Sequence, residues 1–165
     1  MKVIHIFSKL VVPVLLIMNT AVSAQTADQK AAEIKKLIES KKYVFVVQSA
    51  SPVSGGTIQL NTSYHFYVNK DSLVSYLPYF GRAYTANIGS TKSPLDFSSA
   101  DFTYTAKARK KGRYEISIEL KDQNDARQIN LSVSSSGYGT LHINSLSRQP
   151  ISFYGYLTTK KAGRK

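Results

Sequence analysis

The stretch FTYTAKARKKGRYEISIEL, residues 102–120, decides the fold class. Apolar and polar residues alternate on both sides of a short basic turn. A period of two is typical of β-strands that bury one face and expose the other. Paired residues of a hairpin point to the same face of the sheet, so Ala108 is expected opposite Tyr114. The sequence therefore predicts an antiparallel hairpin with a defined register.

The same register fixes the turn of this hairpin. It makes Arg109 and Arg113 the closing pair and leaves a three-residue loop, Lys110-Lys111-Gly112. Such loops need a left-handed backbone in third place, where this loop has glycine. It also places Lys107 opposite Glu115, an opposite-charge cross-strand pair.

Further strand patterns lie on both sides of the hairpin, separated by turn residues such as those at 69–72 and 134–139. Several strands at short spacing favour an antiparallel sandwich or barrel, and strands joined by short turns are usually neighbours in the sheet. Residues 78–100 are the longest irregular segment. The other strands are expected in residues 43–47, 57–68 with a break at 61–63, 73–77, 129–133, 141–143 and 151–153.

A short helix is predicted before the first strand. Thr26 is placed as its N-cap, and Gln29 completes a capping box. Apolar residues follow at helical spacing up to Ser40: Ala27, Ala31, Ile34, Leu37 and Ile38. The fold class is therefore mainly β (α+β), with one N-terminal amphipathic helix followed by a curved antiparallel meander, sandwich or partly closed barrel. The helix is expected to cover an end or an opening of the sheet.

The first residues have the pattern of a secretory signal peptide. Lys2 and Lys9 precede an apolar run from Leu10 to Met18, and Val22-Ser23-Ala24 supplies small residues for cleavage. The run is shorter than the ~20 residues that span a bilayer, although an uncleaved anchor is the alternative. We expect a signal peptide at 1–24, a single β-rich domain at 25–157 and a basic tail at 158–165, with no membrane span after cleavage.

Composition narrows the class of partner. Removing residues 1–24 leaves 20 basic and ten acidic residues, a formal net charge of +10. Such a charge favours anionic glycans or lipid head groups, although it also serves solubility, and export argues against nucleic acid. The chain has no cysteine, which excludes disulfides, thiol nucleophiles and thiolate metal sites.

The sequence offers few residues for catalysis. His65 and His142 alternate with the large apolar residues of their strands, so their side chains are expected to face the solvent. The spacings of zinc, P-loop, Rossmann and Gly-x-Ser-x-Gly sites are absent. Residues 122–125 resemble a calcium loop but lack its later glycine and glutamate, so they indicate a turn. We therefore expect no catalytic residue, metal ion or cofactor.

The first candidate site is the aromatic segment from Tyr76 to Tyr84. Aromatic faces beside an arginine suit stacking on sugar rings or capture of a carboxylate or phosphate. The alternative is that these rings cap the end of the sheet. The ligand-binding residues predicted here are Tyr79, Phe80, Arg82 and Tyr84.

Two further candidates are surface features. The basic hairpin tip could meet an anionic surface, or could be a solvated turn that keeps the hairpin from pairing with other strands. Tyr154 and Tyr156 are two residues apart in one strand, so they point to the same face of the sheet and indicate that this face is half-exposed. The residues of the basic tip are Arg109, Lys110, Lys111 and Arg113.

Several segments carry a family resemblance: residues 70–72 and 76–83, Asp101-Phe102-Thr103-Tyr104, and Arg148-Gln149-Pro150-Ile151-Ser152-Phe153. Together they resemble the domain of unknown function 4251 family, small exported proteins of Gram-negative bacteria. The resemblance extends from about Ala31 to Leu157. It implies a periplasmic or outer-surface location, and it implies neither an activity nor functional residues.

Three functions remain in order of preference. The first is a non-enzymatic periplasmic binding module that holds a small apolar or anionic ligand in the mouth or on the concave face of the sheet. The second is an envelope interaction protein whose basic surface contacts lipid head groups, glycan or a protein. The third is a hydrolase with an unrecognised carboxylate pair, which would need two carboxylates in one cleft.

Overall fold

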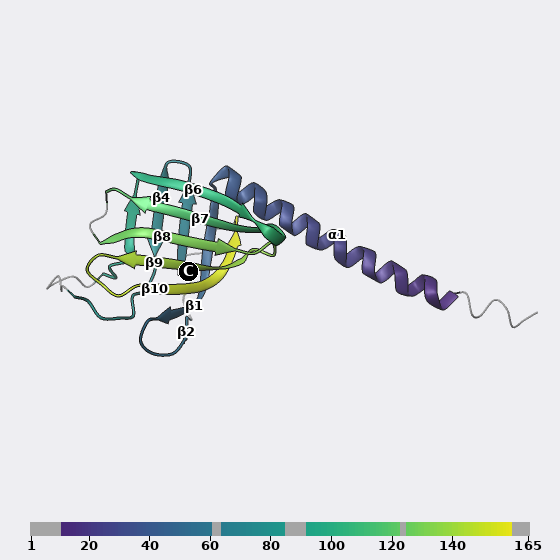
Figure 1. The fold of residues 1–165 in the computed structure, drawn as a ribbon, viewed down its shortest axis with the longest axis horizontal. Helices are drawn as coiled ribbons and strands as arrows, with labels where there is room; N and C mark the ends of the chain where they lie inside the picture. Colours follow the sequence, from purple (N-terminus) through teal and green to yellow (C-terminus); the bar gives the residue numbers. More distant parts are fainter. Residues whose placement is uncertain (1–10, 61–63, 85–91, 123–124, 160–165) are drawn as a thin grey trace, which may run out of the picture.

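The computed structural model describes residues 11–60, 64–84, 92–122 and 125–159, with side chains from residue 26 onward (Figure 1). One long helix is followed by strands throughout these ranges. The elements in chain order are α1 (Val11–Ser40), β1 (Tyr43–Pro52), β2 (Ile58–Gln59), β3 (His65–Asn69), β4 (Ser72–Tyr76), β5 (Asp96–Ser99), β6 (Phe102–Arg109), the 3₁₀ turn η1 (Lys110–Gly112), β7 (Arg113–Leu120), β8 (Ala126–Val133), β9 (Tyr138–Ser145) and β10 (Ile151–Thr158).

All the described strands belong to one antiparallel sheet that nearly closes into a barrel. The strand order is β5-β4-β3-β1-β10-β9-β8-β7-β6, and β2 adds to β1. The predicted mainly-β class is confirmed, and so is the expectation that the last four strands are sequential neighbours. The N-terminal strand β1 lies between β3 and β10, so the two ends of the domain meet in the middle of the sheet.

The register predicted for the hairpin of residues 102–120 is confirmed. Ala108 pairs with Tyr114, and Arg109 pairs with Arg113. The glycine at 112 has φ 65°, as the loop length required. Lys111 also has a left-handed backbone, with φ 61°, which the sequence pattern did not predict.

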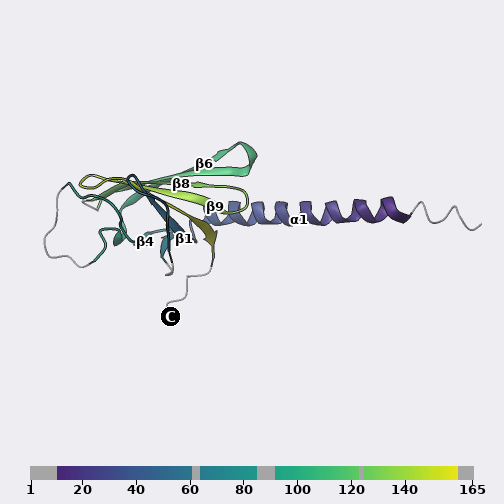
Figure 2. The same cartoon turned by 90° about the horizontal axis from the view of Figure 1, so that it is seen from below.

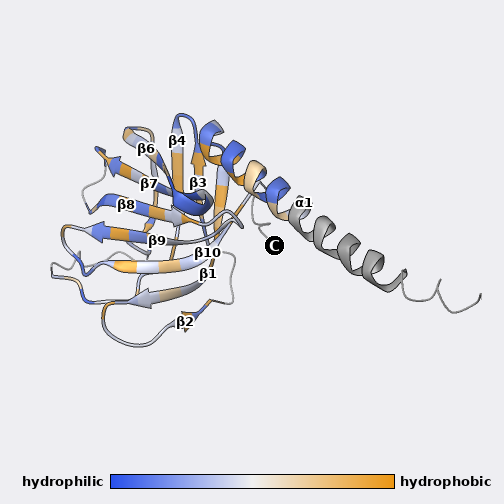
Figure 3. Ribbon diagram, turned by 45° about the vertical axis from the view of Figure 1, so that its right-hand side comes forward, coloured by the Kyte–Doolittle hydropathy of each residue, from blue (hydrophilic) through white to orange (hydrophobic). Residues whose placement is uncertain are grey.

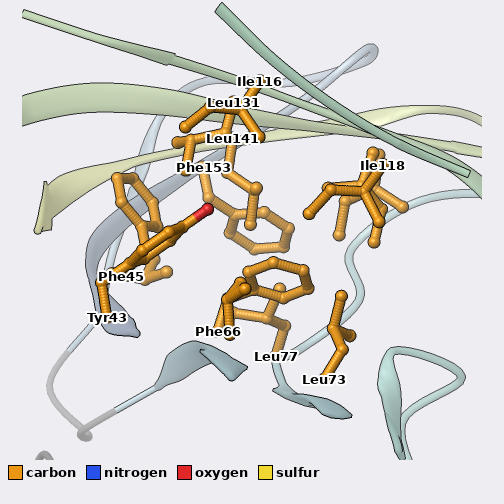
Figure 4. Close-up of a cluster of buried hydrophobic side chains, with 14 of the residues drawn as sticks. Tyr43, Phe45, Phe66, Leu73, Leu77, Ile116, Ile118, Leu131, Leu141 and Phe153 are labelled. Atoms are coloured by element: carbon orange, nitrogen blue, oxygen red, sulfur yellow. The ribbon is translucent and has the colours of Figure 1, made fainter. Parts of the chain in front are cut away.

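Inward-pointing side chains fill the interior of the barrel. Figure 4 shows aromatic rings from β1, β3 and β10 meeting at its centre, with aliphatic side chains from β4 and β7 beside them. These rings include Phe45, Phe66 and Phe153, and each is fully buried. At ~25 cal/mol per Å² of apolar surface, burying a side chain of this size stabilises the fold by about 2–3 kcal/mol.

Two glycines allow the sheet to bend at its C-terminal strands. Gly139 of β9 pairs with Gly155 of β10, and both are at positions of their strands that face the interior of the barrel. A Cβ at Gly155 would lie 2.0 Å from the carbonyl oxygen of Val46 in β1, and one at Gly139 would lie 2.2 Å from that of Ser132 in β8. The backbones come this close because neither residue has a side chain.

The Asp122 carboxylate stabilises the connection between the two edge strands β5 and β6. Asp122 accepts hydrogen bonds from the Ser99 hydroxyl at 2.6 Å and from the backbone N–H groups of Ala100 and Asp101 at 3.1 and 3.4 Å. The hydrogen bond from Ser99 is the main cause that lowers the pKa of Asp122 below its ordinary value. The two strands that end the sheet are thereby held together at one end.

The C-terminal turns of α1 cover the barrel at the other end. Ile34, Leu37 and Ile38 are buried against the sheet, while the N-terminal part of the helix extends away from it (Figures 1 and 2). From edge strand β6, the Tyr104 hydroxyl lies 3.4 Å from the Ile38 carbonyl oxygen and 3.3 Å from the hydroxyl of Tyr43 in β1. The expectation that the helix covers an end of the sheet is confirmed.

Three details of the predicted elements are wrong. The helix begins at Val11, so Thr26 lies inside it and does not cap it, because the apolar residues before it continue the helix. Ala27 is exposed, since at that point the helix has passed beyond the barrel. Residues 78–100 contain strand β5, which pairs with β4 although its sequence, DFSS, is short and mostly polar.

Some of the sequence predictions lie outside the described residues. They concern the charged start of the signal peptide in residues 1–10, the break at 61–63, the middle of the turn at 123–124, and most of the basic tail in residues 160–165. Within the part that is described, no helix combines the length and apolar character needed to cross a membrane.

Candidate functional site

The outer face of strands β6 to β10 presents two rows of polar side chains that run across the strands. Each residue of a row is the register partner of the next, so the rows follow directly from the pairing of the sheet. Figure 3 shows hydrophilic and hydrophobic residues alternating along β7, β8 and β9. The charged row is Lys107, Glu115, Ser132, Thr140 and Tyr154, and the neutral row is Thr105, Ser117, Asn130, His142 and Ser152.

The first four members of both rows line a shallow, open hollow of about 600 Å³. Arg109 also lines it, at the hairpin end of β6. Small hydroxyl and amide side chains form most of its floor, to which Ile116 and Leu131 also contribute. The hollow is therefore suited to a polar ligand, because almost every side chain in it offers a hydrogen bond.

The charges in the hollow do not cancel. Glu115 pairs with Arg109, whose Nε donates to its Oε2 at 2.7 Å. Lys107 is the register partner of Glu115, as predicted, but no carboxylate in the described part of the chain is within ion-pair distance of its ammonium group. The hollow therefore carries one positive charge without a partner.

His142 is held in place by neighbours on both sides. Its Nε2 lies 3.0 Å from the Asn144 side-chain oxygen, and its Nδ1 lies 2.9 Å from the Ser152 hydroxyl. An amide oxygen can only accept, so Nε2 carries a hydrogen, and in the neutral ring Nδ1 then accepts from the Ser152 hydroxyl. The Asn144 amide donates in turn to the Gln128 side-chain oxygen at 3.5 Å. This network fixes the orientation of the polar floor.

A cluster of tyrosines lies beside the hollow on the same face. The ring of Tyr154, at the end of the charged row, stacks on Tyr138 with centroids 6.1 Å apart and an interplanar angle of 12°. Tyr138 also contacts Tyr156 at 5.9 Å in a tilted arrangement. Tyr138 and Tyr154 are each 47% exposed, which is high for such large rings.

The aromatic residues predicted as a ligand site do not converge on one hollow. Tyr79 is half-buried, and its hydroxyl lies 3.0 Å from the Arg82 carbonyl oxygen and 3.1 Å from that of Gln149. Phe80 packs against the core, whereas Arg82 and Tyr84 are exposed. The ring of Tyr79 thus holds loop backbone in place, which agrees with the alternative that this segment caps the sheet.

An ion pair stabilises the same region. Asp125 accepts hydrogen bonds from Arg148 Nε at 2.7 Å and from the Ser147 hydroxyl at 2.5 Å, and the Arg148 guanidinium lies 5.5 Å from the centroid of the Tyr79 ring. Burial would raise the pKa of Asp125, but these hydrogen bonds and the charge of Arg148 lower it below its ordinary value. The backbone of residue 84 donates to the Ser147 carbonyl at 2.7 Å. These contacts join the loop at 79–84 to the β9–β10 connection.

A second hollow, of about 470 Å³, lies next to this loop. Tyr79 contributes to it, and so do Lys92 and Asp96. Its other lining residues are Tyr64, Tyr76, Leu77, Pro78, Ser93 and Pro94. Of the four residues predicted to bind a ligand, only Tyr79 is among those that line it.

The basic tip lies at the end of the molecule from which α1 emerges (Figures 1 and 2). Arg109 is paired with Glu115, whereas Lys110, Lys111 and Arg113 are exposed and have no carboxylate partner among the described residues. The tip therefore presents three unpaired positive charges to the solvent.

No group of three or more histidine, aspartate and glutamate side chains in the described ranges could hold a metal ion. The sequence pattern pairs Lys107 with Glu115 but does not bring His142 or Tyr154 to them. The signal that could have done so is the run of serine, threonine and asparagine on the polar phase of four consecutive strands.

Comparisons with known proteins identify the family. The family model for a domain of unknown function, DUF4251, matches residues 25–157. The fold resembles the crystal structure of a DUF4251 family protein from Bacteroides eggerthii DSM 20697, with a TM-score of 0.57 and 14% sequence identity. That similarity covers 78% of this chain and 86% of the other, and it supports the fold alone. No curated protein matches the chain.

Proposed function

The chain belongs to the DUF4251 family, whose function is unknown, and we propose that it is an exported, non-enzymatic binding module for a small anionic ligand. The ligand site is the hollow on the outer face of β6 to β9. The observation that supports this proposal is the pair of polar rows, which bring eight hydrogen-bonding side chains from four strands into one hollow.

The unpaired charge of Lys107 supports an anionic ligand. Because Glu115 is already occupied by Arg109, a ligand carboxylate or phosphate can pair with Lys107 without displacing an existing ion pair. The polar floor beneath it holds the rest of the ligand through hydrogen bonds. An apolar ligand is disfavoured, because side chains fill the barrel interior that would have received it.

The composition of the hollow supports binding rather than hydrolysis. Glycoside hydrolysis by two carboxylates needs both groups in one cleft, about 5–10 Å apart. Glu115 is the single carboxylate that lines this hollow in the described part of the chain, and its oxygen is bonded to Arg109. This arrangement positions a charge and does not supply an acid and a base.

Export is proposed from the first 24 residues. Lys2 and Lys9, the apolar run from Leu10 and the small residues Val22-Ser23-Ala24 have the order of a secretory signal. A binding module without cysteine folds in an oxidising compartment without pairing errors.

Native mass spectrometry of the protein purified from the cells that make it tests the proposal. A retained small anion supports the binding module, and its mass gives the chemical class. Lys107→Gln is expected to weaken binding about tenfold, because it removes the one charge in the hollow that has no ion-pair partner among the described residues. Lys70→Gln is the matched control, since Lys70 is an exposed lysine on the β3–β4 turn far along the sheet. Equal binding by both variants contradicts the proposal.

The basic tip favours a second candidate function, contact with an anionic envelope surface. Three unpaired charges on one turn would attract lipid head groups and would be screened by salt. Flotation with anionic vesicles at low and high salt tests this function. Replacing Lys110 and Lys111 by glutamine is expected to abolish vesicle binding and to leave ligand binding in the hollow unchanged. Vesicle binding that survives both the replacement and high salt contradicts it.

A further inference from the structure

We propose that the ligand is an acidic oligosaccharide that lies along the charged row, with its acidic group at Lys107 and a sugar ring stacked on Tyr154. This inference rests on the proposed function, because it uses the same hollow, and it names the class of ligand. The row connects the unpaired charge at one end to the exposed aromatic ring at the other, with only hydroxyl groups and Glu115 between them.

The aromatic end of the row selects a sugar over other anions. Tyr154 is the register partner of Thr140, which lines the hollow, so it lies on the next strand beside a lining residue. Its ring stacks on that of Tyr138, while 47% of the residue remains exposed. Sugars combine an apolar C–H face with peripheral hydroxyl groups, and a ring next to hydroxyl side chains complements both.

The polar floor is ordered before any ligand binds. His142 is fixed between Ser152 and Asn144, so little conformational freedom remains to be lost there on binding. Thr140 and Ser132 of the charged row are exposed, and their hydroxyl groups can both donate and accept. A ligand with alternating donors and acceptors, as in a chain of sugar rings, matches this surface.

The length of the row argues for an oligomer. Lys107 and Tyr154 are on strands β6 and β10, four strand spacings apart. At ~4.8 Å per spacing, the two side chains are rooted about 19 Å apart. One sugar ring cannot contact both ends, whereas a short chain of rings can.

An extended peptide fits the site less well. Peptides that join sheets do so through main-chain hydrogen bonds along an open strand edge. The charged row runs across the strands and offers side chains, because the backbones of β7, β8 and β9 are already paired on both sides.

Isothermal titration of the purified protein with four probes tests the inference: galacturonic acid, a linear oligogalacturonate, a neutral galactose oligomer of the same length and an oligoglutamate peptide of the same charge. The oligogalacturonate is expected to bind at least tenfold more tightly than the other three. Tyr154→Ala is expected to weaken its binding about tenfold and to leave the binding of galacturonic acid unchanged.

Two variants control for loss of structure. Tyr154→Phe keeps the ring and is expected to bind the oligogalacturonate within about twofold of the original protein. Tyr84→Ala removes a tyrosine that is 69% exposed but lies in the loop at 79–84, and it is expected to change nothing. Circular dichroism of all variants verifies that they fold.

The outcomes separate this inference from the proposed function. If galacturonic acid binds and Lys107→Gln weakens it, but chain length adds nothing and Tyr154→Ala is silent, the oligosaccharide inference is overturned and the anion site stands. Oligoglutamate binding as tight as that of oligogalacturonate also overturns it. If no acidic probe binds and native mass spectrometry finds no retained anion, both proposals fail.

Discussion

Gly155→Ala tests whether the close approach of β10 and β1 determines the shape of the barrel. A Cβ at this position would lie 2.0 Å from the Val46 carbonyl oxygen and 2.9 Å from its carbonyl carbon. Real Cβ atoms essentially never approach other heavy atoms within 3.0 Å, so the two strands must separate by about 1 Å. The obstacle is backbone in the middle of the sheet, where β1 pairs with β3 and β10, and no flexible side chain can move aside.

The magnitude follows from two opposing contributions. Overpacking a well-packed site costs ~1–3 kcal/mol, and weakening the ladder next to Val47, the register partner of Gly155, costs ~0.5–1.5 kcal/mol for each hydrogen bond. The loss of backbone freedom in the unfolded state stabilises an alanine by ~0.4–1 kcal/mol. We therefore expect Gly155→Ala to lower the free energy of unfolding by about 2–3 kcal/mol, a large part of the ~5–15 kcal/mol of a typical domain.

Denaturant unfolding followed by circular dichroism measures this loss. Gly56→Ala is the matched control, because a Cβ there meets no atom within 4 Å and its φ is not positive. The control is expected to stay within about 0.5 kcal/mol of the original protein. If Gly155→Ala unfolds at the same denaturant concentration as Gly56→Ala, the close approach of the two strands does not constrain the fold, and the reasoning is refuted.

Three further predictions concern pH and the helix. Hydrogen bonds from Ser147 and Arg148 lower the pKa of Asp125 against the effect of burial, so the stability that its charged form contributes is lost as the pH falls below 3.8. In denaturation at a series of pH values, Asp125→Asn should be less stable than the original protein at neutral pH and should lose less stability on acidification. An equal loss of stability in acid would contradict this. Burial raises the pKa of Tyr43 well above 10.0, so above pH 10 the folded state retains a proton that the unfolded state releases, and the free energy of unfolding falls as the pH rises. Tyr43→Phe should make this fall less steep. An unchanged slope of the free energy of unfolding against pH would contradict the prediction. Ile34→Ala should lower the free energy of unfolding by about 2–4 kcal/mol, because Ile34 is fully buried where α1 covers the barrel. A loss below about 1 kcal/mol would show that the end of the helix does not pack against the barrel.

Local patterns predicted the sheet well wherever the turn left only one register. The loop at 110–112 is short and ends in glycine, so the pairing of β6 with β7 could be predicted residue by residue and is confirmed. Alternation also predicted which residues of β7 to β10 face the core. Strand β5 was not predicted, because its stability comes from pairing with β4 and from the Asp122 contacts at the next corner. Neither is visible in a segment of four residues of which three are polar.

The candidate site could not be predicted because it depends on several registers at once. Each row combines residues from five strands, and only the first pairing, between β6 and β7, could be deduced from the sequence. The pairing of β8 with β9 contains an irregularity between Ala126 and Gln128 that no local signal marks. The aromatic segment at 76–84 attracted attention instead, because clustered aromatic residues look the same in sequence whether they bind a ligand or cap a sheet.

The pairing around Glu115 shows why correct register does not determine chemistry. Lys107 and Glu115 are directly opposite, as predicted, yet the carboxylate bonds to Arg109, two residues farther along β6. The planar guanidinium donates along fixed directions to a carboxylate, whereas the ammonium of lysine is a point charge that gains less from one neighbour at a solvated surface. The pair that forms is therefore the diagonal one, and the direct partner is left with its charge free. That uncompensated charge at the edge of a hydroxyl-lined hollow is the feature that turns an ordinary polar sheet face into a candidate site for an anion.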